Sequence, residues 1–112
     1  MKPYHGVMLV PSEAEVMESL EKIIGEPIPP LFAKNDRHKL GEKPGNGFGF
    51  YAQQGHVISL VVEVFKPKFT ELPAAIGNLS KLEVMKLGAN KLSKFPPSFI
   101  DLHWLHVFDI LE

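Results

Sequence analysis

Histidine and carboxylate side chains are the groups in this sequence that could perform acid–base or metal chemistry. His103 and His106 are three residues apart, but no histidine or acidic partner follows at the spacing of a metal site. Asp36, Arg37 and His38 are adjacent in a polar stretch, where closeness in sequence gives no fixed geometry. No nucleophile is paired with a base. We therefore expect a protein that is not an enzyme and that has no metal and no cofactor.

Glycine-rich phosphate binding is a second chemistry to consider. Gly45, Gly47 and Gly49 lie at the end of a polar segment, residues 33–47. Their spacing does not fit a P-loop, no Lys-Ser/Thr pair follows, and no helix begins after them. We therefore interpret residues 33–47 as a surface loop, because this segment is rich in glycine and charge.

Residues 12–24 have the pattern of an amphipathic helix. Ser12 is a suitable N-cap, and Glu15 three residues later completes a capping box. Gly25 supplies the left-handed residue that commonly ends a helix. The apolar stripe of this helix consists of Val16, Met17, Leu20, Ile23 and Ile24.

Residues 48–65 have the pattern of a β-hairpin. The segment Gln53-Gln54-Gly55 predicts the turn, and apolar runs precede and follow it. The second run continues directly into the segment 69–104. The hairpin is therefore expected to lead into whatever structure that segment forms.

The segment 69–104 repeats itself at an offset of 23 residues. The matched pairs are Phe69 with Leu92, Leu72 with Phe95, Pro73 with Pro96, Ile76 with Phe99, Leu79 with Leu102, Leu82 with Leu105, Met85 with Phe108 and Leu87 with Ile110. Residues 82–92 follow LxxLxLxxNxL, and the residues after them follow LPxxIxxL. A unit of this length with leucines at fixed places is typical of stacked repeats.

These motifs resemble those of the leucine-rich repeat family in its 23-residue form. The helix and hairpin before them resemble the N-terminal region of small prokaryotic, notably archaeal, members. The resemblance implies an α/β fold, in which a short solenoid of about two and a half repeats carries parallel strands on a concave face and a helix plus β-hairpin forms an N-terminal cap. The expected segments are a cap at 1–56, with helix 12–24, loop 33–47 and hairpin strand 48–52, and repeats at 57–112, divided into 57–81, 82–104 and a partial 105–112.

The strand of the first repeat has two alternative registers. A strict offset of 23 residues selects Val62 and Val64 as its inward residues, whereas the family pattern selects Leu60 and Val62. The alternatives differ by two residues, so Leu60, Val62 and Val64 face the core in either case. Val61 and Glu63 are expected to face outward.

The resemblance implies a non-catalytic, protein-binding module. The residues expected on its concave face are Val61, Glu63, Val84, Lys86, Val107 and Asp109. The apolar members of this set have a simpler explanation, because β-branched residues favour strands whether or not they bind anything.

The sequence stops inside the third repeat, which predicts an open sheet edge there. The residues expected at this edge are Trp104, Leu105, His106, Phe108 and Ile110. We expect another protein, or a second copy in a homodimer, to cover it. The alternative is a self-associating structural unit or a truncated fragment of a longer repeat protein, with no independent binding role.

Composition excludes several classes of partner. The chain has 112 residues, a formal net charge of -1 and no cysteine, so we expect no nucleic-acid partner and no disulfides. The only apolar run near the N-terminus, residues 7–10, is too short for a membrane span or a signal peptide. We therefore expect a cytoplasmic protein that does not bind membranes.

Overall fold

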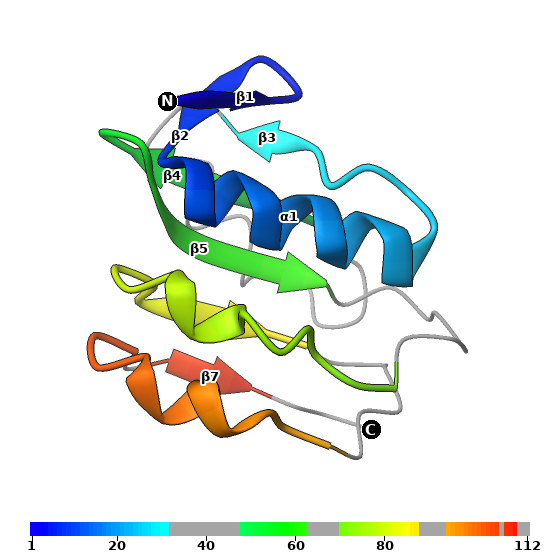
Figure 1. The fold of residues 1–112 in the computed structure, drawn as a ribbon, viewed down its shortest axis with the longest axis vertical. Coiled ribbons are helices and arrows are strands. Elements are labelled where there is room, and N and C mark those ends of the chain that lie inside the picture. Colours follow the sequence, from blue (N-terminus) through cyan, green and yellow to red (C-terminus); the bar gives the residue numbers. More distant parts are fainter. Residues whose placement is uncertain (32–47, 63–69, 88–93, 106, 110–112) are drawn as a thin grey trace.

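The computed structural model describes residues 1–31, 48–62, 70–87, 94–105 and 107–109. Within these ranges the chain forms one α-helix, two 3-10 helices and seven strands. The bounds are β1 Lys2–Tyr4, β2 Val7–Leu9, α1 Pro11–Ile24, β3 Pro30–Leu31, β4 Phe48–Gln53, β5 His56–Val62, η1 Ile76–Asn78, β6 Val84–Lys86, η2 Pro97–Asp101 and β7 Val107–Asp109. β1 and β2 form a small sheet, and the other strands form a five-stranded sheet in the order β3-β4-β5-β6-β7 (Figure 1).

The helix α1 begins one residue earlier than predicted. Pro11 occupies its first turn and Val10 is the N-cap, with no side-chain hydrogen bond to the cap. The prediction that Ser12 caps the helix in a capping box is therefore wrong. Pro11 is suited to the first helical position, because its fixed φ is helical and it has no N–H to leave unpaired. The helix ends at Gly25, which has a φ of 90°.

The hairpin of β1 and β2 is tied to α1 by polar contacts. Lys2 Nζ lies 3.1 Å from Glu18 Oε1. The Tyr4 hydroxyl donates to Glu21 Oε1 over 2.9 Å, and His5 Nε2 lies 2.6 Å from the same oxygen. Burial raises the pKa of Tyr4, so its hydroxyl stays a neutral donor to Glu21.

The strands β4 and β5 form the expected antiparallel hairpin. Gln54 and Gly55 have φ values of 51° and 83°, which is the geometry of a tight two-residue loop with the twist that a hairpin needs. A bulge between Tyr51 and Ala52 shifts the register. Beyond the bulge, Phe50 pairs with Leu60, and both side chains are fully buried.

The strands β5, β6 and β7 are parallel neighbours. Met85 pairs with Phe108, as the 23-residue offset predicts. On the side of β5, Met85 pairs with Leu60. The offset between these two residues is two residues longer than the 23-residue offset of the repeat. The first strand therefore has the register that the family pattern selects, in which Leu60 aligns with Met85.

One hydrophobic core lies between the five-stranded sheet and the helical segments. Figure 1 shows α1 in front of β4 and β5, and the yellow-green η1 and orange η2 in front of β6 and β7. The core cluster draws residues from both ends of the chain, among them Leu9, Met17, Leu20, Phe50, Leu60, Ile76, Leu79, Met85 and Leu102. Residues of the expected cap and of the expected repeats therefore share a single core.

The predicted leucine-rich repeat solenoid is wrong. The sheet is open and mixed, because β4 runs antiparallel to β5 and β3 joins the same sheet beside β4. The molecule measures 34 × 30 × 27 Å, which is not elongated. Among these strands the 23-residue spacing holds only between β6 and β7. The preceding helix and hairpin join their sheet and core instead of ending a stack of separate units.

The prediction that Val61 lies on an accessible concave face is also wrong. Val61 is fully buried and clusters with Tyr51 and Ile58 on the sheet face opposite α1. The longer spacing at β5 places Ser59, and not Val61, beside Val84. Val61 pairs with Lys86, and both Val84 and Lys86 are half-buried.

Several predicted residues lie outside the described ranges. These include the loop 33–47 with its Asp36, Arg37, His38, Gly45 and Gly47, and also Glu63, His106 and Ile110. Val107, Phe108 and Asp109 are described as backbone in β7, paired with β6.

The two 3-10 helices are joined by Ser98. Its hydroxyl donates to the Ala74 carbonyl over 2.6 Å and accepts the Gly77 N–H over 3.2 Å. Gly77 lies so close to η2 that a Cβ there would overlap the carbonyl oxygen of Ser98. The packing of η1 on η2 therefore requires glycine at this position.

We predict that Gly77→Ala lowers the free energy of unfolding by about 1–3 kcal/mol, because the added methyl must push η2 away from η1. Urea denaturation followed by circular dichroism measures this. The control is Asn78→Ala at the next, exposed position, which should change stability by less than about 0.5 kcal/mol. Equal effects of the two substitutions would contradict the close approach.

The contacts of Glu21 with Tyr4 and His5 lead us to predict that the protein loses stability in acid. The hydrogen bonds from His5 and then Tyr4 hold the pKa of Glu21 below its ordinary value of 4.5. A carboxylate with a lowered pKa stabilises the fold above its unfolded pKa, and this contribution disappears as the pH falls through its folded pKa. Wild type should therefore lose stability below pH 4.5 more steeply than Glu21→Gln. Urea midpoints measured at neutral pH and down to about pH 3 check this, and parallel curves for the two proteins would refute it.

Candidate functional site

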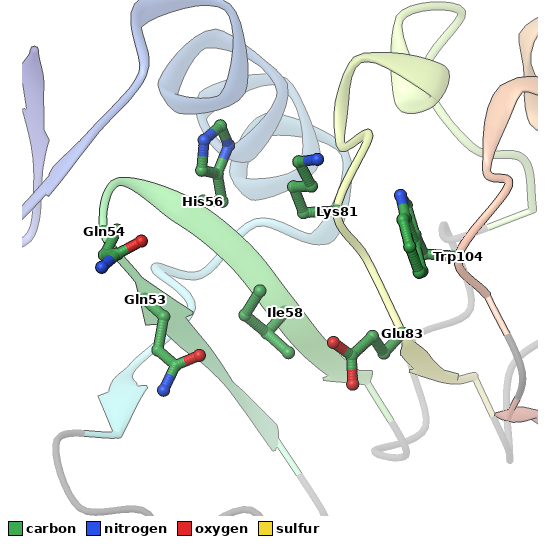
Figure 2. A pocket seen from close by; sticks show the side chains of 7 residues that line it. All are labelled: Gln53, Gln54, His56, Ile58, Lys81, Glu83 and Trp104. Atoms are coloured by element: carbon green, nitrogen blue, oxygen red, sulfur yellow. The ribbon is translucent and has the colours of Figure 1, made fainter.

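A pocket lies where β4 ends and where β5, β6 and β7 begin. It has a volume of about 250 Å³ and is open to solvent. The hairpin contributes Gln53, Gln54, His56 and Ile58 to its lining. The segments before β6 and β7 contribute Lys81, Glu83 and Trp104 (Figure 2).

His56 is held in place by a buried carboxylate beneath the pocket. Glu13 Oε2 lies 2.6 Å from His56 Nδ1, and Glu13 Oε1 accepts the Val57 N–H over 2.8 Å. The Glu13 residue is only 1% exposed. A carboxylate oxygen accepts hydrogen bonds, so Nδ1 of His56 is the donor in this contact and Nε2 is the ring nitrogen that the contact does not use.

Local structure explains why these residues meet. Glu13 lies in the first turn of α1, where the helix dipole favours a negative charge. His56 is the first residue of β5, immediately after the tight turn. Val10 donates its N–H to the Gly55 carbonyl over 2.9 Å, which brings the start of α1 against that turn.

An imidazole oriented by a carboxylate is an arrangement used by general bases and by metal ligands. The described lining residues include no serine, threonine, cysteine or tyrosine that the imidazole could activate. Within the ranges that the structure describes, no group of three or more His, Cys, Asp or Glu could hold a metal ion. In the described lining the imidazole is therefore a group that can form a hydrogen bond with a ligand.

Trp104 borders the pocket and is 61% exposed. It is the only tryptophan in the sequence. The ammonium of Lys81 lies 5.7 Å from the centroid of its ring, within the range of a cation–π contact. Lys81 therefore helps to hold the indole at the rim of the pocket.

The open edge of the five-stranded sheet begins just beyond Trp104. In the described part of the chain β7 is the last strand of the sheet and pairs only with β6. Three of the five exposed large hydrophobic residues in the described ranges lie in the segment 94–105, shortly before this strand: Phe95 at 42%, Ile100 at 81% and Trp104 at 61% exposure. Leu105, predicted to belong to this edge, is instead half-buried and packs against the core.

Sequence reasoning missed the pair of Glu13 and His56. Its signal was present, because Glu13 lies three and four residues before Val16 and Met17 and so belongs to the apolar stripe of the helix. An acidic residue on a buried face needs a partner. The partner, His56, is 43 residues away, and no local pattern could identify it.

Comparisons with protein-family models, with curated proteins and with solved structures gave no match to this chain. The resemblance to the leucine-rich repeat family therefore stays a prediction. No helix in the described ranges is long and apolar enough to cross a membrane.

We predict that Glu13→Ala lowers the free energy of unfolding by about 1–3 kcal/mol, because it leaves the buried Val57 N–H without an acceptor. The matched control is Glu15→Ala, an exposed glutamate in the same turn, which should cost less than about 0.5 kcal/mol. Urea denaturation gives both values. A cost for Glu13→Ala no larger than the control would show that the buried contact does not hold α1 to β5.

Proposed function

We propose that this protein is a non-catalytic binding module that takes up an extended segment of another protein chain along β7. The observation that carries the proposal is the coincidence of an unpaired sheet edge with exposed apolar side chains. In the described structure β7 pairs on one side only, and Ile100 and Trp104 are the most exposed large hydrophobic residues outside the N-terminal Met1. Exposed apolar groups beside an open edge are typical of interaction surfaces.

Strand addition supplies the mechanism. The outer N–H and C=O groups of β7 would pair with the backbone of the incoming segment, which gives affinity with little dependence on sequence. Ile100 on η2 and Trp104 before β7 would cover apolar side chains of that segment. Large side chains of this kind commonly provide most of the binding energy of an interface.

The composition of the edge also favours pairing. Open edges are often protected by lysine, by proline or by a bulge. The described residues of β7 are Val107, Phe108 and Asp109, which include neither lysine nor proline. These three residues therefore include neither of the two protective residue types.

Self-association is the second candidate, because the same edge could pair with β7 of a second copy around a twofold axis. Light scattering on a sizing column across a dilution series separates the two candidates. A dimer of 12.5 kDa chains that dissociates on dilution would favour self-association. A monomer at every concentration would favour the first candidate, in which a different protein chain binds at the edge.

Selection of peptides from a random display library on the immobilised protein tests the proposal. We expect enrichment of extended peptides with alternating apolar residues. Val107→Lys, which places a charge on the edge strand, and Ile100→Glu should each weaken binding of a selected peptide at least about tenfold. The control is Met8→Glu, an exposed apolar position on β2 that should leave binding unchanged.

The outcome that contradicts the proposal is equally specific. Selected peptides that bind the Val107→Lys and Ile100→Glu proteins as tightly as wild type would place the binding surface elsewhere. Circular dichroism and urea midpoints of both variants confirm that a loss of binding is not a loss of fold.

A further inference from the structure

We propose that the pocket between the β4–β5 turn and Trp104 binds a single neutral sugar ring, a pyranose. The proposal rests on the chemistry of the side chains that line the pocket. Together they provide the aromatic ring of Trp104, the apolar side chain of Ile58, and polar groups that donate hydrogen bonds, accept them or do both. Figure 2 shows Gln53 and Gln54 on one side of the opening, Trp104 on the other and Ile58 between them.

The charges of the pocket argue against an ionic ligand. Lys81 and Glu83 both line it and carry opposite signs, two residues apart on the same segment. Their charges sum to zero, so the described charged groups of the lining give the pocket no net charge that would select an ion of either sign.

The polar groups argue against a wholly apolar ligand. Such a ligand would remove water from the amides of Gln53 and Gln54, the imidazole of His56 and the two charged groups without replacing its hydrogen bonds. Each polar group left unpaired on desolvation costs free energy. A ligand that fits must itself donate and accept hydrogen bonds around its rim.

The hydroxyl groups of a pyranose meet this requirement, because each one is both donor and acceptor. They can accept from Lys81 and from the amides, and they can donate to Glu83 and to the amide oxygens. His56 offers them Nε2 in a fixed orientation, because Glu13 holds Nδ1 at 2.6 Å. A preoriented polar group contributes more to affinity than a mobile one.

The apolar part of the site matches the remaining surface of the ring. The C–H face of a pyranose can lie on the exposed indole of Trp104, and the edge of the ring can reach Ile58. The volume of about 250 Å³ is below the roughly 300–1,000 Å³ typical of sites for drug-sized ligands, so one ring suits it better than several. An open pocket of this size predicts weak binding, with a Kd on the order of 1–10 mM.

The test is a titration of the full-length protein with three methyl glycosides of glucose, galactose and mannose, each as the pyranoside. Trp104 is the only tryptophan and lines the pocket, so a change in tryptophan fluorescence reports on the surroundings of this side chain. We expect at least one pyranoside to give a saturable change below about 100 mM, and to shift the side-chain amide NMR signals of Gln53 and Gln54. Sodium acetate and cyclohexanol, the ionic and apolar probes, should give no saturable change.

Two variants provide the specificity test. Gln53→Ala removes a hydrogen bond, and Glu83→Gln replaces a charged acceptor with a weaker neutral one, so each should weaken the binding about three- to tenfold, while Met8→Ala should bind as wild type does. The proposal is overturned if none of the three pyranosides saturates, if cyclohexanol or acetate gives the same change, or if Gln53→Ala and Glu83→Gln bind as tightly as wild type. Because Gln53 lies on β4, which β5 and β6 separate from β7, the peptide binding proposed above should be unaffected by Gln53→Ala.

Discussion

The buried carboxylate of Glu13 is the constraint on which the arrangement of this molecule depends. An ionised group inside a protein is tolerated only where hydrogen bonds replace its water. Glu13 obtains them from the Val57 N–H and from His56, both at the start of β5. The first turn of α1 therefore has to lie against the start of β5, and the helix has to cover the sheet face that β5 presents. One contact thus couples the N-terminal segment to the sheet and orients the imidazole at the pocket.

The strand β5 then decides what kind of sheet results. It pairs antiparallel with β4 and parallel with β6, so it joins a local hairpin to the repeated segment. The repeat alone would extend by adding parallel strands, each covered by its own short helix. Here β4 adds a strand on the other side of β5, and α1 covers these strands. Side chains of the hairpin, of the helix and of the repeated segment then fill one core. The result is a mixed, open sheet.

Local patterns predicted local features well. The apolar stripe of α1, its end at Gly25, the turn at Gln54 and the pairing of β6 with β7 all follow from spacing in the sequence. Features that depend on distant partners were not predictable in this way. Val61 alternates as an outward residue should, yet it is buried in a cluster with Tyr51 from the neighbouring strand. The repeat spacing also could not show that other strands join the same sheet, which is why the expected solenoid was wrong.

Trp104 connects the two proposed binding surfaces. It lines the pocket on one side, and the segment that carries it leads directly into the edge strand β7 on the other (Figure 2). The pocket contains an oriented imidazole but, in its described lining, no group for that imidazole to activate. The edge offers backbone groups and the apolar surface of Ile100. We propose recognition at both surfaces, of a small polar ring in the pocket and of an extended chain at the edge.

The central claim is that the edge of β7 is open, and amide hydrogen exchange followed by NMR tests it most directly. A parallel strand paired on one side leaves alternate amides without a strand partner. In a sample dilute enough to be monomeric, the account predicts that Val107–Asp109 include amides that exchange as fast as those of exposed loops, while the amides of Leu60 and Val61 in the central strand β5 exchange slowly. Slow exchange of every amide in β7, matching that of β5, would show that the edge is already covered within the chain and would contradict the account.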